Sequence, residues 1–330
     1  MRINNRMKLV TGVLACALAS FALGWDLSRY ETLKEVGDAT AQPVRFADPE
    51  FPYIHPLVSI AIPNAKGFPE LEHVKQDVVD IIRKATDEHR ATDVGVYFRE
   101  PNNAHWFGIN ENNKFDPGSL IKVPIMLAYL KQSELDPKIM KKQLYYDPAK
   151  NDSLPNPLPA QLPRGRYPAE ELMRAMIVDS DNIAKDVLFD NMPAATIQDV
   201  FDEMSANFLK DPTGTISPKE YIIILSRIYS ATYLDRALSN YAMELLTQTT
   251  FKNGLVAGLP KDVQVAHKYG DRGIYEEGKP VGVELHDCGM VYAGKNPYSL
   301  CVMTKGLDSS TLAKTISDIS AVIYADRGDF

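Results

Sequence analysis

A serine and a lysine three residues apart begin an apolar stretch that suits a buried helix. Ser119 follows the turn residues Pro117 and Gly118, and Lys122 precedes the run Val-Pro-Ile-Met-Leu-Ala-Tyr-Leu. Residues three apart lie on the same face of a helix, so the two side chains can meet. An amine held in apolar surroundings tends to lose its proton and can act as a base toward the hydroxyl. The alternative is an N-capping serine followed by a solvated lysine.

Two later segments supply the partners that this pair would need. Ser180 and Asn182 follow a predicted helix that ends near Val178, and Lys268 ends a predicted strand. Taken alone, the first segment is also compatible with a helix end or a turn, and the second carries little information. Their order after Ser119 is what favours a reaction centre.

Acyl transfer needs a nucleophile, a base, a proton route to the leaving group and donors for the oxyanion. In that scheme Ser119 is the nucleophile, Lys122 is the base, and Ser180 carries a proton between the amine and the leaving nitrogen. Asn182 orients Lys122 or hydrogen-bonds a substrate amide. Lys268 supplies positive charge for a substrate carboxylate and lowers the pKa of its neighbours.

Composition excludes some other classes of function. The 330 residues carry a net charge of −7, and no basic stripe stands out, so we expect no nucleic-acid partner. His267 and His286 are interpreted as strand residues satisfied by hydrogen bonds, and we expect no metal and no cofactor. Cys288 and Cys301 either pair, if the mature protein is exported, or remain two small buried thiols.

The N-terminal residues read as an export signal. Arg2, Arg6 and Lys8 precede an uncharged, largely apolar run over 9–25. Residues 1–25 are therefore either a cleaved signal peptide or a membrane anchor, and we expect the rest to work outside the cytoplasmic membrane. That location is the membrane surface, the periplasm or the extracellular space. Proline-spaced residues 26–65 are interpreted as a stalk and extended linker, which leaves 66–330 as the catalytic domain.

The remaining patterns define the elements that must position these residues. Apolar spacing predicts helices and alternation predicts strands, with a helical block in the middle of the chain. The expected order is a helix at 69–89, strands at 94–98 and 105–109, helices within 119–241, strands at 263–268, 281–292 and 298–304, and a helix at 309–324. This order predicts an α+β fold, in which a five-stranded antiparallel sheet carries the first and last helices and the helical block forms a second lobe. The site is expected in the cleft between sheet edge and lobe.

The three motifs, in this order, resemble those of class A β-lactamases and penicillin-binding proteins. The blocks Glu284–Tyr292 and Asn296–Met303 resemble the paired strands of that family, and the similarity covers roughly 66–330. The resemblance implies that Ser119 forms an acyl-enzyme with a small-molecule β-lactam or a peptidoglycan peptide. We expect the protein to be a monomer. A β-lactam substrate would link the chain to antibiotic resistance.

The resemblance also implies roles along the third motif. The backbone N–H groups of Ser119 and Asp271 would form the oxyanion hole, and Gly270 belongs to the same substrate-binding strand. Tyr269, however, stands where the family usually has Thr or Ser to bind the substrate carboxylate. Arg272 is the candidate that would bind this carboxylate instead.

A second departure concerns release of the acyl group. Class A β-lactamases carry a Glu-x-x-Leu-Asn loop that activates water, and no clear match follows the second motif here. Glu203 and Asp211 are acidic but lack that context. Without a carboxylate to activate water, the acyl-enzyme should persist. The alternatives are therefore a D,D-peptidase or esterase, or a penicillin-binding sensor domain whose signal is the adduct.

Overall fold

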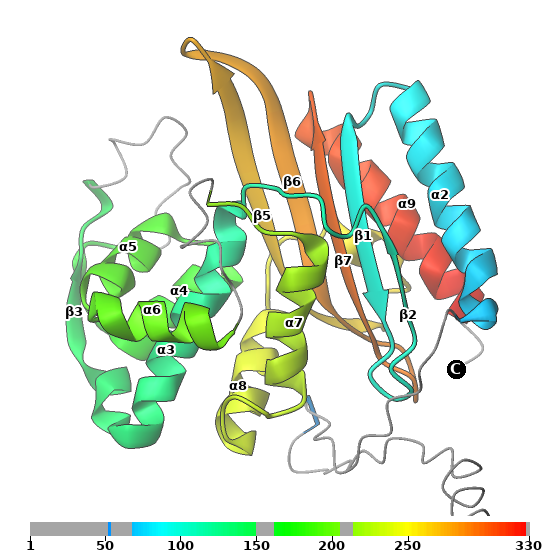
Figure 1. Ribbon diagram of the computed structural model, residues 1–330. Coiled ribbons are helices and arrows are strands. Elements are labelled where there is room, and N and C mark those ends of the chain that lie inside the picture. The colour runs from blue at the N-terminus through cyan, green and yellow to red at the C-terminus, as the bar shows by residue number, and fades with distance from the viewer. Residues whose placement is uncertain (1–51, 54–67, 150–161, 205–213, 328–330) are drawn as a thin grey trace, which may run out of the picture. The chain divides into compact units, whose positions relative to one another are not determined.

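Five antiparallel strands form the central sheet of the computed structural model, in the order β2-β1-β7-β6-β5 (Figure 1). The structure describes residues 52–53, 68–149, 162–204 and 214–327. The strands of the sheet are β1 (Asp93–Arg99), β2 (Trp106–Ile109), β5 (Gln264–Glu276), β6 (Lys279–Tyr292) and β7 (Tyr298–Gly306). Every neighbouring pair is antiparallel, which confirms the predicted fold class.

Two helices from opposite ends of the domain cover one face of the sheet. These are α2 (Glu72–Asp87), preceded by the 3-10 turn η1 (Pro69–Leu71), and α9 (Ser309–Arg327) (Figure 1). Apolar residues at helical spacing face the strands, because a helix buries one stripe and a strand buries alternate residues. Val96, Leu300 and Val302 belong to this core.

The helical lobe packs against the other face, which confirms the predicted second lobe (Figure 1). Its central helix α3 is apolar nearly all round and is buried, as a helix enclosed by other helices must be. The lobe contains η2 (Gly118–Ile121), α3 (Lys122–Leu135), η3 (Pro137–Lys141), α4 (Ala169–Val178), α5 (Asn182–Asp190), α6 (Ala194–Glu203), α7 (Pro218–Tyr229) and α8 (Arg236–Thr247).

Two features of the lobe relate directly to the sequence patterns. At the start of α7, Ser217 and Glu220 have the residue types and spacing of a reciprocal cap, and each side chain accepts from the other's backbone N–H. A two-stranded sheet of β3 (Gln143–Tyr146) and β4 (Gly165–Pro168) was not predicted. Each of its strands has only four residues, which is too short for alternation to be recognised.

The predicted end of the strand at Lys268 is wrong. Strand β5 continues to Glu276 and pairs with β6 through a turn at Glu277 and Gly278, where both residues have positive φ. The added part is mostly exposed, so it lacks the buried alternation on which the prediction rested. The resulting hairpin extends beyond the other strands and follows the third motif directly (Figure 1).

Cys288 and Cys301 form a disulfide. They lie opposite one another on the neighbouring strands β6 and β7. Of the two interpretations open from the sequence, the disulfide is therefore the one observed. Both sulfurs belong to the core between the sheet and the helical lobe. Because Lys268 pairs with Cys288 across β5 and β6, the bridge lies next to the third motif.

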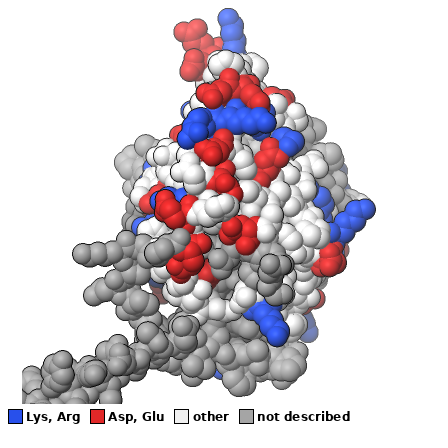
Figure 2. Space-filling view, turned by 90° about the vertical axis from the view of Figure 1, so that its right-hand side faces the viewer, with Lys and Arg blue, Asp and Glu red and all other residues white. Residues whose placement is uncertain are grey.

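The charged surface on the side of α2 and α9 is mixed. Lys and Arg side chains alternate there with Asp and Glu side chains (Figure 2). Several of them pair locally, as Arg83 does with Asp80 at 2.8 Å and as Lys314 does with Asp318. The described part of this side therefore presents no continuous basic surface.

The segment before the domain lies largely outside the described residues. This applies to residues 1–25, the predicted signal or anchor, and to nearly all of 26–65, the predicted linker. The chain divides into two compact units, 1–44 with 59–64 and 45–58 with 65–330, and only the second unit has described residues. Within it, the Tyr53 N–H donates to Asn240 Oδ1 at 2.9 Å. No helix in the described ranges is long and apolar enough to cross a membrane.

Candidate active site

Ser119 lies in the short turn η2, immediately before α3, and this turn packs closely on strand β5. Two glycines make the approach possible. A Cβ at Gly118, where φ is +50°, would lie 2.7 Å from the Asp271 carbonyl oxygen, and a Cβ at Gly270 would lie 2.5 Å from that of Pro117. Both distances are shorter than a Cβ tolerates, so only glycine lets the first and third motifs meet here.

Lys122 is the first residue of α3, and its amine meets four oxygen atoms. Its Nζ lies 3.0 Å from Ser119 Oγ, 2.6 Å from Ser180 O, 3.0 Å from Ser180 Oγ and 2.7 Å from Asn182 Oδ1. The side chain is 1% exposed. An ammonium has three N–H donors and no acceptor, whereas a neutral amine has two N–H donors and one lone pair that can accept from a hydroxyl.

The electrostatics of this amine fit a base. Burial, followed by repulsion from Lys185, lowers the pKa of Lys122 from its ordinary 10.5 to about 7. Asp271 and Asp181 oppose that effect more weakly. A pKa close to neutral leaves a large fraction of the amine unprotonated at the pH at which it would have to accept a proton.

Ser180 lies in a constrained turn between α4 and α5. Its φ of +58° is unusual for a residue with a side chain and costs about 1–3 kcal/mol when the surroundings must enforce it. The next residue, Asp181, caps α5 by accepting from the Ala184 N–H at 2.8 Å, and Tyr146 Oη donates to its other oxygen at 2.6 Å. These contacts fix the turn, and the turn aims the Ser180 hydroxyl at both lysines.

Lys268 approaches Ser180 from the sheet. Its Nζ lies 2.9 Å from Ser180 Oγ and 3.2 Å from the Tyr269 carbonyl oxygen. The side chain is fully buried. Burial, followed by repulsion from Lys122, holds the pKa of Lys268 well below its usual range. The Ser180 hydroxyl therefore bridges two buried amines, which is the contact that a proton shuttle requires.

The other predicted substrate-binding residues continue along β5. Tyr269 stacks on Phe251, with ring centroids 4.3 Å apart. The backbone of Asp271 lies against the Ser119 turn, because its N and O atoms are both close to Gly118. The Arg272 side chain is 65% exposed, and its Nε lies 3.4 Å from Asp116 Oδ2. All nine predicted site residues thus fall into one neighbourhood.

Two residues that support this turn were not identified as site residues from the sequence. His286 Nε2 lies 2.8 Å from the Asp116 carbonyl oxygen, and the Thr304 N–H donates to His286 Nδ1 at 3.2 Å. The carbonyl only accepts, so Nε2 carries a proton, and Nδ1 accepts from Thr304 and so carries none. Glu284 completes the support by accepting from the Asp116 N–H at 2.8 Å. No local pattern could reveal these contacts, because they join β6 to a turn far away in the sequence.

The second histidine belongs to a separate buried pair. His267 Nδ1 lies 2.8 Å from Asp287 Oδ1, and the other oxygen of Asp287 accepts from the Leu255 N–H at 2.9 Å. Leu255 opens the turn η6 (Leu255–Gly258), so the pair ties the loop before β5 to the sheet. In the described ranges, no three His, Cys, Asp or Glu residues gather in a way that could hold a metal ion.

Of the two acidic candidates for activating water, Glu203 does not join the cluster. Glu203 is exposed at the end of α6, where Tyr233 Oη donates to its carboxylate at 2.8 Å. Asp211 lies outside the described residues. That the acyl-enzyme persists therefore stays a prediction.

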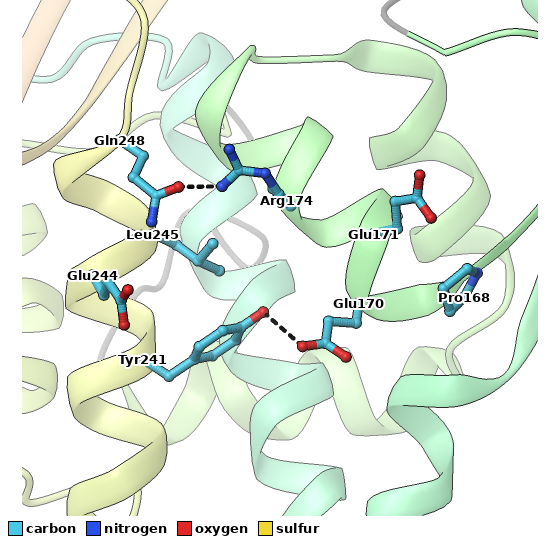
Figure 3. Close-up of a pocket in the computed structure, with 8 residues that line it drawn as sticks. All are labelled: Pro168, Glu170, Glu171, Arg174, Tyr241, Glu244, Leu245 and Gln248. Atoms are coloured by element: carbon cyan, nitrogen blue, oxygen red, sulfur yellow. Dashed lines mark hydrogen bonds between the residues drawn. The ribbon is translucent and has the colours of Figure 1, made fainter.

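A pocket of about 330 Å³ lies elsewhere, between α4 and α8 (Figure 3). Tyr241 Oη points across it to Glu170 at 3.5 Å, and Arg174 pairs with Gln248 on the opposite wall (Figure 3). None of the nine predicted site residues lines it. It is separate from the Ser119 cluster.

The fold agrees with comparisons to known proteins. The model of the beta-lactamase enzyme family matches residues 74–326. The chain therefore belongs to the beta-lactamase enzyme family, whose membership supports a hydrolase. A comparison with curated protein sequences finds no match.

Solved structures show the same fold at low sequence identity. PBP-A is 23% identical with a TM-score of 0.66, over 79% of this chain and 97% of that one. A beta-lactamase from Chitinophaga pinensis DSM 2588 is 20% identical with a TM-score of 0.65, over 78% of this chain and 100% of that one. The TLA-1 extended spectrum beta-lactamase is 18% identical with a TM-score of 0.65, over 77% of this chain and 99% of that one.

Proposed function

We propose that this chain is an exported serine hydrolase that forms an acyl-enzyme at Ser119, on a β-lactam or a related cell-wall amide. The observation that carries the proposal is the position of Lys122, whose Nζ lies 3.0 Å from Ser119 Oγ. Burial lowers the pKa of this lysine to about 7. A nucleophile and a base in direct contact are the minimum that covalent catalysis requires.

The proposed reaction assigns each proton a route. Ser119 Oγ attacks the substrate carbonyl carbon while Lys122 takes the hydroxyl proton. The N–H groups of Ser119 and Asp271 hold the resulting oxyanion. The proton then passes from Lys122 through the Ser180 hydroxyl to the leaving nitrogen as the C–N bond breaks. The products of this step are the acyl ester of Ser119 and a neutral amine.

Two observations support export. The Cys288–Cys301 disulfide is typical of proteins that mature in an oxidising compartment. The sequence also begins with basic residues followed by an uncharged run. A fusion of residues 1–65 to a reporter that is active only outside the cytoplasm tests this part of the proposal. An inactive, intact fusion would contradict it.

The rate of release separates the proposed hydrolase from its alternatives. The sequence lacks the glutamate-bearing loop, and Glu203 is bound to Tyr233, which favours a slow release. A long-lived adduct would favour a penicillin-binding sensor, whereas turnover of esters or peptides with little lactamase activity would favour an esterase or a D,D-peptidase.

Intact-protein mass spectrometry with a fluorescent penicillin tests acylation. We expect a mass increase equal to the whole penicillin, lost in Ser119→Ala. Ser133→Ala is the matched control, because it removes a hydroxyl from α3, the helix that follows the Ser119 turn, and this hydroxyl donates to the Leu130 carbonyl oxygen. Labelling that survives Ser119→Ala would overturn the acyl-enzyme, and the decay of the adduct then measures release.

A further inference from the structure

The Tyr269 ring occupies a defined place beside the reaction centre. Phe251 stacks on it at 4.3 Å with an angle of 20° between the ring planes. The Lys268 Nζ lies over the same ring, 4.2 Å from its centroid. A ring has two faces, so Phe251 on one face leaves the other for Lys268. The three side chains therefore form a stack, in which the phenol ring separates Lys268 from Phe251.

This stack encloses Lys268. Its Nζ lies 2.9 Å from Ser180 Oγ, 3.2 Å from the Tyr269 carbonyl oxygen and 4.2 Å from the centroid of the Tyr269 ring. The lysine has no exposed surface. A substrate carboxylate could reach it only if the Tyr269 ring moved away from both neighbours.

Three carboxylates, besides the Lys268 amine, act on the Tyr269 phenol. Burial raises the pKa of Tyr269, Asp271 adds to that increase, and Asp179 and Asp287 contribute in the same direction, while the Ser180 hydroxyl opposes it. A substrate carboxylate brought to this place would be repelled by these carboxylates and would lose its water, while Lys268, which is fully buried, already donates to Ser180 Oγ. Arg272 is largely exposed and lies beside Asp116, so its charge is already partly balanced.

We infer that Tyr269 and Phe251 close the place where a substrate carboxylate would meet Lys268, so that the site selects acyl donors whose neighbouring carboxyl is capped as an ester or an amide. This inference rests on the proposed acylation of Ser119 and specifies its substrate class. The favoured substrates are neutral relatives of the β-lactams and cell-wall amides already proposed.

A matched pair of substrates tests the inference directly. Benzylpenicillin and its methyl ester share the same scissile amide and differ in the charge of one carboxyl group. The rate of Ser119 acylation is measured for each by mass spectrometry and divided by the rate of hydrolysis in buffer alone. We expect the ester to react at least about tenfold faster than the acid, because the acid must place an unpaired charge beside the ring.

Three variants locate the cause. Tyr269→Thr removes the ring and restores a short hydroxyl, so the ester preference should fall at least about tenfold as the acid gains access to Lys268. Tyr269→Phe keeps the ring and should keep the preference. Tyr275→Thr is the matched control, since this tyrosine lies on the same strand but is 49% exposed. The ratio of the ester and acid acylation rates in Tyr275→Thr should equal that of the wild type.

The outcomes separate this inference from the proposed function. If neither substrate acylates Ser119, the proposed function fails. If the acid reacts faster than the ester in the wild type, the acyl-enzyme stands and the inference is overturned. A preference for the ester that persists in a folded Tyr269→Thr would also overturn it. If that variant does not fold, Phe251→Leu, which removes the stacked ring, should lower the preference in its place.

Discussion

The two lysines of the site have the same residue type and similar burial, but their neighbours differ in kind. Lys122 meets four oxygen atoms, among them the Ser119 hydroxyl that would react. Lys268 meets Ser180, a carbonyl oxygen and an aromatic ring. Burial lowers the pKa of both. The difference shows that burial lowers the pKa of an amine, whereas the groups around the amine decide whether it can contact a substrate.

The largest expected effect comes from removing the first amine. Lys122→Met keeps an unbranched apolar chain but no base, so Ser119 acylation should fall by about 10²–10⁴-fold. Lys131→Met is the matched control on the same helix, where the lysine pairs with Glu134 at 2.7 Å. Quenched time courses read by mass spectrometry measure the rate of Ser119 acylation in both variants. Acylation at the wild-type rate in Lys122→Met would remove this lysine as the base.

The same variant gives a stability readout with a definite sign. The pKa of Lys122 is about 7 in the folded protein and ordinarily 10.5, so between these values the unfolded chain binds more protons than the folded one. Stability contributed by this residue therefore rises with pH across that range and is lost as pH falls toward about 7. Denaturant unfolding should show that the free energy of unfolding of the wild type increases relative to that of Lys122→Met as the pH rises. A constant difference would contradict the lowered pKa.

A second prediction uses pH to test the base itself. Acylation should decline below pH about 7, approaching tenfold for each further pH unit, because protonation blocks the amine. Asn182→Asp places a negative charge near Lys122 Nζ, where the amide oxygen now lies at 2.7 Å, and should raise the midpoint of this profile. Asn191→Asp, at the other end of the same helix, is the control. An unmoved midpoint in Asn182→Asp would argue that another group titrates.

A third prediction concerns the support of the Ser119 turn. His286→Leu removes the contact with the Asp116 carbonyl oxygen, and we expect acylation to fall by about 10–10²-fold because the nucleophile is misplaced. The pH midpoint should stay near 7, since the surroundings of Lys122 are unchanged. A positioning role requires both results. A shifted midpoint, or an unchanged rate in the folded variant, would exclude it.

The smallest effect on chemistry is expected at the disulfide beside the Lys268 strand. Replacing Cys288 and Cys301 together by alanine should lower the free energy of unfolding by about 2–3 kcal/mol, as for other bridges that close short loops. The rate of Ser119 acylation should stay as it is in the wild type, because Lys122 and Lys268 make their hydrogen bonds to oxygen atoms and to neither sulfur. Denaturant unfolding with and without a reductant provides the comparison. A loss of acylation in the folded double variant would show that the bridge also holds Lys268 in place.

The sequence predicted the Ser119–Lys122 pair better than it predicted the part of the site that lies on strand β5. Ser119 and Lys122 are three residues apart, so a single helical turn was enough to bring them together. The five strands and the flanking helices followed from alternation and helical spacing in long segments. By contrast, β5 was predicted to end at Lys268, because the exposed residues up to Glu276 carry no buried pattern.

The sequence by itself determined the fold class, the pairing of Ser119 with Lys122, and the substitution of tyrosine for a small hydroxyl at position 269. Only the tertiary structure decided what these residues do to one another. It placed Ser180 between two buried amines and brought His286 into contact with the turn that carries Ser119. It also placed the Tyr269 ring against both Phe251 and Lys268. The physical reason is distance along the chain: local spacing governs contacts within one turn, whereas contacts between strand, loop and lobe depend on how the whole core packs.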